Sequence, residues 1–257
     1  MPPLTCADLE SLLRARKLDR TLTSALPPLD PYNELATAAT GVTAFDGQLG
    51  GGFPRGHLSE LVGPRSSGRT SVLLQALAAA TWRGELVALV DALDMFDARS
   101  AAAAGVDLAR LLWIRGHVVP DPGLCRDTNQ RALEQVVRAF TLVLQAGSFG
   151  LVAFDVAEAP LDAIKRLPFT TWLRLQRLVE GRQTACVLVG AEPMARSSAG
   201  LTIKLGIGKP ESGGMGFRGR LFNGLDVEAR VVSARLRRQE SAAEGQNVRV
   251  SLSTTCD

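Results

Sequence analysis

The residues from 63 to 71, GPRSSGRTS, have the composition and spacing of a phosphate-binding loop. They match the pattern G-x-x-x-x-G-K-[ST] at Gly63, Gly68 and Thr70, but Arg69 stands where the pattern has lysine. In such a loop the glycines let backbone N–H groups point inward, and the start of the following helix attracts phosphate. The hydroxyl of Thr70 is placed to meet Mg²⁺. The segment therefore predicts nucleotide phosphate chemistry.

Arg69 puts one part of that chemistry in question. Lysine offers a compact charge to the terminal phosphates, whereas the arginine side chain is longer and planar. We expect Arg69 either to pair with phosphate in another geometry or to crowd the pocket. A glycine-rich turn without a ligand is the simpler alternative. The sequence leaves open whether ATP and Mg²⁺ still bind.

The elements around the loop alternate between apolar strands and helices. Unbroken apolar runs indicate strands that are buried on both faces of a largely parallel sheet. The predicted strands are 57–63, 85–91, 111–115, 150–156 and 184–191. The predicted helices are 71–84, 97–104, 131–147 and 168–183. The sequence predicts an α/β fold in which the phosphate loop joins the first of these strands to the first helix.

Two regions flank this core. Residues 8–20 have helical spacing and precede a proline-containing connector, so we divide the chain into an N-terminal helix and linker (1–40) and a core domain (41–257). Residues 193–224 are rich in glycine and cations and are expected to be irregular. The alternating residues after them predict two closing strands joined by a polar loop.

Composition limits the class of protein. The chain has 257 residues, 46% of them hydrophobic, and a net charge of +3. Its four cysteines are scattered, which argues against a zinc site or a disulfide framework. A signal peptide and a membrane-spanning run are both missing from the pattern, so we expect a cytoplasmic protein. The tryptophans Trp82, Trp113 and Trp172 are expected to pack in the core or between helices.

Three segments, in order, resemble the RecA recombinase family. Residues 41–71 resemble its pattern LD..LGGG.P.G...E..GP.SSGKT, and residues 86–115 resemble the segment ending in A..LGVD...LL. Residues 150–156 resemble the Walker B strand and place Asp155 at the Mg²⁺-associated position. The resemblance implies a RecA-like P-loop core. It implies nucleotide contacts at Gly63, Ser66, Ser67, Gly68, Arg69, Thr70, Asp97 and Asp155, with Thr70 and Asp155 also at the metal.

The chain departs from the family at the residues that handle ATP. The family's catalytic glutamate falls on Leu93, which cannot polarise water, and its neighbour Asp94 is a weak substitute. The adenine-stacking tyrosine falls on Ser100, and the sensor glutamine falls on Ala191. Together with Arg69, these changes predict that hydrolysis is lost and that the chain is not an enzyme.

The DNA-contacting loops of the family also differ here. Residues 156–171 leave room for only a shortened first loop, and residues 193–220 take the place of the second. A basic, flexible loop can follow the phosphates of single-stranded DNA, although a solvated surface loop has the same composition. The candidate DNA-binding cations are Arg196, Lys204, Lys209, Arg218 and Arg220.

Among RecA relatives, the chain is most similar to the ImuA-type proteins of damage-induced mutagenesis. That resemblance rests on size, layout and weakened catalytic residues. It implies an accessory role in the SOS response and translesion synthesis, with a Y-family polymerase-like protein and/or a RecA recombinase as partner. The competing hypotheses are a slow ATP-dependent recombinase paralogue that binds single-stranded DNA and a regulator of cell division or circadian type.

Overall fold

The computed structural model describes residues 36–120, 126–195, 199–213, 221–234 and 247–253. The strands are β1 (Thr37–Ala38), β2 (Phe53–Pro54), β3 (Leu58–Val62), β4 (Val87–Asp91), β5 (Leu111–Arg115), β6 (Leu151–Asp155), β7 (Ala185–Gly190), β8 (Ala199–Leu205), β9 (Lys209–Gly213), β10 (Leu221–Ala234) and β11 (Asn247–Ser253). The helices are α2 (Thr43–Leu49), α3 (Arg69–Trp82), α4 (Ala98–Ala103), α5 (Arg126–Ala146), α6 (Leu161–Arg166), α7 (Phe169–Val179) and the short 3-10 turn η2 (Leu108–Arg110).

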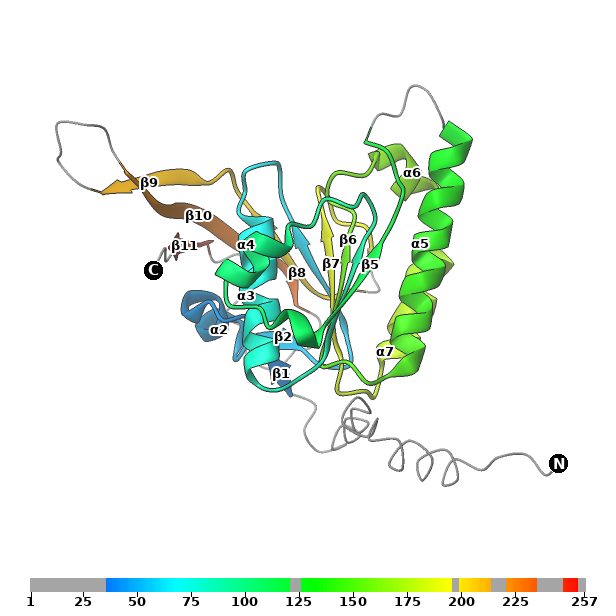
Figure 1. Ribbon diagram of the computed structural model, residues 1–257, viewed down its shortest axis with the longest axis horizontal. Coiled ribbons are helices and arrows are strands. Elements are labelled where there is room, and N and C mark those ends of the chain that lie inside the picture. Colours follow the sequence, from blue (N-terminus) through cyan, green and yellow to red (C-terminus); the bar gives the residue numbers. More distant parts are fainter. Residues whose placement is uncertain (1–35, 121–125, 196–198, 214–220, 235–246, 254–257) are drawn as a thin grey trace.

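A single large sheet forms the centre of the protein (Figure 1). Its strand order is β11-β10-β8-β3-β7-β6-β4-β5, and β9 pairs with β10. Strands β8, β3, β7, β6, β4 and β5 run parallel, whereas β10 is antiparallel to β8, β9 and β11. The predicted mostly parallel α/β sheet is confirmed, and so is the closing antiparallel pair at the C-terminal end.

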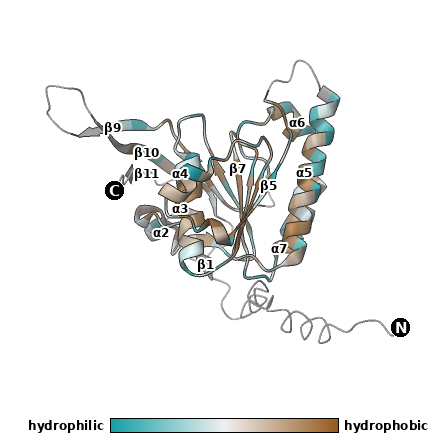
Figure 2. Ribbon diagram, viewed as in Figure 1, coloured by the Kyte–Doolittle hydropathy of each residue, from teal (hydrophilic) through white to brown (hydrophobic). Residues whose placement is uncertain are grey.

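Helices cover both faces of this sheet. Helices α2, α3 and α4 lie on one side, and α5, α6 and α7 lie on the other (Figure 1). Each side has its own apolar core, and the central strands are hydrophobic along their length (Figure 2). Every residue of β3, β4 and β7 is buried, which explains why these strands are apolar except for Ser59 and Glu60 in β3 and Asp91 at the end of β4.

Helix α5 shows how the sequence pattern produces this packing. Leu133, Val137, Phe140 and Leu144 recur at helical spacing and are all buried against the sheet. Phe140 stacks on Phe154 of β6 with the ring centroids 4.8 Å apart. This contact fixes the helix over the strand that ends at the predicted Walker B aspartate.

The segment expected to be irregular is partly a sheet, and that expectation was wrong. Residues 199–205 form β8 and residues 209–213 form β9. The alternating Leu201, Ile203 and Leu205 are buried, and β8 lies parallel to β3. The glycines around these residues concealed a period-two pattern that favours a strand.

Other sequence-based expectations had different outcomes. The predicted helix at 8–20 lies outside the described residues. Trp172 is buried as expected and Trp113 is half-buried, but Trp82 is 84% exposed at the end of α3, so its assignment to the core was wrong. No helix within the described ranges combines the length and the apolar character needed to cross a membrane.

Candidate functional site

The predicted phosphate loop connects β3 to α3 in a backbone conformation that its residues make possible. Gly68 caps α3 with φ 81° and ψ 8°, in the left-handed region that favours glycine. A Cβ atom on Gly63 would come within 2.7 Å of the Leu205 carbonyl oxygen, so a side chain has no room there. Ser66 also has a positive φ of 59°. The loop is therefore tightly turned and packed against the end of β8.

A cavity of about 630 Å³ lies beside this loop. Except for Gly63, all the predicted nucleotide contacts line it: Ser66, Ser67, Gly68, Arg69, Thr70, Asp97 and Asp155. Its volume falls in the range of small-molecule and cofactor pockets. The hydroxyl oxygen of Ser67 is buried at the cavity and has no hydrogen-bond partner among the described residues. An unpaired buried hydroxyl beside a turned loop fits a phosphate ligand.

Arg69 is bound by protein groups instead of facing open solvent. Its Nη1 donates to the carbonyl oxygen of Gly190 over 2.9 Å, and its Nη2 donates to Oε1 of Glu158 over 3.0 Å. The side chain is only 7% exposed. Glu158 also pairs through Oε2 with Nε of Arg65 at 2.7 Å. The cation of the phosphate loop is thus already neutralised by a carboxylate.

The position predicted for the catalytic glutamate holds a leucine, and the neighbouring aspartate points into another interaction. Leu93 lines the cavity and packs against the apolar core on the α5 side. Asp94 is not among the cavity-lining residues, and both of its carboxylate oxygens accept hydrogen bonds from Arg115, at 2.6 and 2.7 Å. Asp94 is therefore committed to a neighbouring arginine, as its weak candidacy suggested.

Asp97 and Ser100, which both line the cavity, interact with each other. Asp97 caps α4 by accepting hydrogen bonds from the backbone N–H groups of Arg99 and Ser100. A further bond from the Ser100 hydroxyl is the main cause that lowers the pKa of Asp97. The predicted nucleotide contact of Asp97 thus belongs to a carboxylate that already stabilises a helix start.

Asp155 ends β6 at the edge of the cavity, where its protonation is unusual. Burial, with the nearby carboxylates of Asp91 and Glu158, raises the pKa of Asp155 to about 6, while the Ala157 N–H and Arg69 oppose that rise. Asp155 and Thr70 both line the cavity, as the metal prediction requires. Mg²⁺ commonly combines one or two carboxylates with substrate phosphates, so these residues would hold the ion only together with a nucleotide.

Two acidic residues were missed in the sequence. Glu158 follows the predicted Walker B strand but gave no signal of its own. Glu60 lies in the middle of β3, is 1% exposed, and accepts hydrogen bonds from Met194 N, Ala195 N and Thr202 Oγ1. A charged residue within an otherwise uncharged, fully buried strand is a detectable signal, because buried carboxylates require such partners. Glu60 fixes the chain where it leaves β7.

Neither Lys204 nor Lys209, the two candidate DNA-binding cations within the described residues, lines this cavity. Lys204 is exposed on β8 and faces Arg230 across the antiparallel pair, whereas Lys209 begins β9 opposite Asp226. The remaining candidates, Arg196, Arg218 and Arg220, lie outside the described residues. The DNA contacts therefore remain a prediction.

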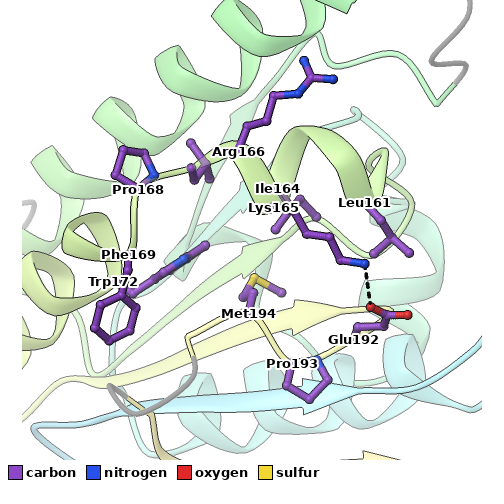
Figure 3. A pocket seen from close by; sticks show the side chains of 11 residues that line it. Leu161, Ile164, Lys165, Arg166, Pro168, Phe169, Trp172, Glu192, Pro193 and Met194 are labelled. Carbon is purple, nitrogen blue, oxygen red and sulfur yellow. Dashed lines mark ion pairs between the residues drawn. The ribbon is translucent and has the colours of Figure 1, made fainter.

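A second pocket, of about 450 Å³, lies between α6, the start of α7 and the residues that follow β7 (Figure 3). Phe169, Trp172 and Met194 line it, and Lys165 pairs with Glu192 at its rim over 3.4 Å. None of the residues predicted for nucleotide contact lines this pocket, and neither do Lys204 and Lys209, the DNA-contact candidates in the described part of the chain.

Comparisons with known proteins agree with this architecture. Residues 28–159 match the RecA N-terminal domain family. Protein RecA of Synechococcus sp. (strain CC9902) is 42% identical over 106 residues, which cover 40% of this chain and 26% of that protein. Protein RecA of Salinispora tropica is 38% identical over 130 residues, which cover 50% of this chain and 33% of that protein.

The structural comparison extends further along the chain. The crystal structure of the RadB recombinase matches with a TM-score of 0.57 at 18% identity, covering 83% of this chain and 94% of that chain. The fold is accordingly the RecA/RadB-like α/β fold. The sequence matches, in contrast, span only about a quarter to a third of the length of the curated relatives.

Proposed function

The chain belongs to the RecA N-terminal domain family, and on that premise we propose that it is a RecA-like accessory protein of the DNA damage response. In this proposal it acts in the cytoplasm, in damage-induced mutagenesis of the translesion-synthesis type. It binds a Y-family polymerase-like protein and/or a RecA recombinase, and it does not hydrolyse ATP.

The observation that carries the proposal is the state of the cavity beside the phosphate loop. Its loop cation, Arg69, is paired with Glu158, and its position for a general base holds Leu93. A P-loop enzyme needs its cation at the terminal phosphates and a group that orients the attacking water. The pairing of Arg69 with Glu158 and the leucine at the general-base position support a binding role over a catalytic one.

The competing function is a slow, DNA-dependent ATPase of the recombinase type. The placement of Thr70 and Asp155 at one cavity favours it, because these groups would hold Mg²⁺ with a nucleotide. In that case the chain's own residues would position the phosphates and the ion, and the rate would be low without a general base.

Nucleotide turnover separates these two functions. We expect no ATP hydrolysis above background, with or without single-stranded DNA. Turnover that disappears in Arg69→Ala and Asp155→Ala would contradict the accessory proposal. The binding role is tested by capture of a purified Y-family polymerase-like protein, and separately of RecA, on the immobilised chain, with an unrelated P-loop protein as the control. Failure to capture either protein would argue against the proposed partners.

A further inference from the structure

The ion pair between Arg69 and Glu158 joins three parts of the fold. Arg69 starts α3, Gly190 ends β7, and Glu158 follows β6, so the guanidinium crosses the carboxyl edge of the sheet. Both carboxylate oxygens of Glu158 are held by arginines of the phosphate loop, at 2.7 Å from Arg65 and 3.0 Å from Arg69. Carboxylate and phosphate are interchangeable partners for arginine. Glu158 thus occupies the place of an anionic ligand.

The phosphate whose place Glu158 takes can be identified from the phosphates that the loop cation contacts in a P-loop. In a P-loop, the cation after the second glycine reaches the terminal phosphates, and backbone N–H groups cradle those nearer the nucleoside. Here a third phosphate would meet a cation that is already bound, and it would lie against the negative charge of Glu158. Like charges at this range repel strongly in a half-buried site.

The groups that would hold the inner phosphates remain available. Gly68 caps α3 without a side-chain hydrogen bond, so the N–H groups that begin this 14-residue helix keep their attraction for anions. The buried Ser67 hydroxyl has no partner among the described residues, and Thr70 is exposed at the cavity. The cavity continues from the loop to Asp97 and Ser100.

We infer that this cavity is a nucleoside diphosphate site in which the Arg69–Glu158 ion pair takes the position of the third phosphate. The inference rests on the proposed function, because a protein that does not turn over ATP has no need to admit its terminal phosphate. The inference adds the ligand class, a nucleoside diphosphate, and the residue that sets the preference for diphosphate over triphosphate, Glu158.

The test is isothermal titration calorimetry of the full chain with ADP, AMP and the non-hydrolysable β,γ-methylene analogue of ATP, each with Mg²⁺. We expect ADP to bind at least about tenfold more tightly than the triphosphate, a difference of about 1.4 kcal/mol. AMP should bind more weakly than ADP, because it leaves the loop N–H groups without the second phosphate. In Glu158→Gln, which keeps the side-chain shape without the charge, the preference for ADP should fall about tenfold.

Controls distinguish this effect from damage to the fold. Glu192→Gln removes a carboxylate from the separate pocket beside Lys165, so it should leave the ADP preference unchanged. Thermal unfolding without nucleotide checks that each variant is folded, and Glu158→Ala replaces Glu158→Gln if the latter is not.

Three results would overturn the inference: equal or tighter binding of the triphosphate, an unchanged preference without the Glu158 charge, or no binding of ADP. Turnover of ATP measured separately bears on the proposed function alone, so the two can fail independently.

Discussion

Asp91 and Asp155 lie directly beside each other, as paired residues at the ends of the parallel strands β4 and β6. The two carboxylates differ in the hydrogen bonds that they accept. Asp91 accepts hydrogen bonds from Leu93 N, Phe96 N and Trp113 Nε1, at 3.2, 2.8 and 3.4 Å. Asp155 accepts one from Ala157 N at 2.9 Å, and both carboxylates line the cavity. Asp91 therefore holds the turn after β4, whereas Asp155 has fewer hydrogen bonds from the described residues.

Replacing Asp155 should reveal its raised pKa as a dependence of stability on pH. The pKa of Asp155 rises from 3.8 to about 6, so folding favours the protonated form. Wild-type stability is then retained below about pH 4 and falls as the pH rises through 6. Relative to wild type, Asp155→Asn should gain up to about 3 kcal/mol between pH 4 and pH 7. Urea unfolding followed by tryptophan fluorescence measures this difference.

Asp97→Asn is the matched control, because the pKa of Asp97 is lowered whereas that of Asp155 is raised. Hydrogen bonds from Ser100 and Arg99 lower the pKa of Asp97 below 3.8, so its stabilising effect is present above that pH and is lost only in stronger acid. The difference between Asp97→Asn and wild type should stay flat between pH 5 and pH 7. A parallel pH dependence in both variants would show that Asp155 is not the titrating group.

Glu60 should be far more sensitive to truncation than to loss of charge. In Glu60→Ala, the N–H groups of Met194 and Ala195 lose their acceptor at 2.6 and 2.7 Å inside the core. We expect a loss of about 3 kcal/mol or more in the free energy of unfolding, because several buried groups become unpaired. Glu60→Gln keeps an acceptor oxygen and should lose about 1 to 2 kcal/mol.

Hydrogen exchange gives Glu60 a local readout. The Met194 and Ala195 amides should exchange faster in the alanine variant than in the glutamine variant, while amides of α5 change equally in both after correction for global stability. Equal exchange at these two amides in both variants would mean that Glu60 does not hold the chain after β7.

Arg55 is a second largely buried charged residue with several partners, and it lies just before β3. Its side chain pairs with Glu85 at 2.6 Å and donates to the carbonyl oxygens of Gln183, Thr37 and Gly150. Arg55→Ala should cost about 2 kcal/mol in chemical unfolding, because the carbonyl oxygens of Gln183 and Thr37 lose a donor and Glu85 keeps only Arg83 as a partner. Lys165→Ala breaks an exposed pair with Glu192 and should change stability by less than about 0.5 kcal/mol. Similar losses in the two variants would contradict this assignment.

The sequence was informative where one local pattern determined the structure. The phosphate loop was found because the spacing of Gly63, Gly68 and Thr70 defines a backbone shape. The central strands were found because burial on two faces makes most of their positions apolar. Glu158 could not be predicted, because its partner Arg69 lies 89 residues away and the contact depends on side-chain direction. The interaction that defines this site is thus tertiary, although both residues are visible in the sequence.

The burial of the three tryptophans could not be predicted from the sequence either, and it can be tested directly. Nothing in the residue type separates Trp82, which is 84% exposed, from Trp172, which is 3% exposed. Trp82→Phe should change the free energy of unfolding by less than about 0.5 kcal/mol and remove most of the fluorescence that iodide quenches. Trp172→Ala should cost about 3 to 5 kcal/mol, because it empties a large buried volume under α7. If iodide quenching survives in Trp82→Phe, the exposed indole is not the one at the end of α3. The packing of α3 against the sheet would then have to be revised.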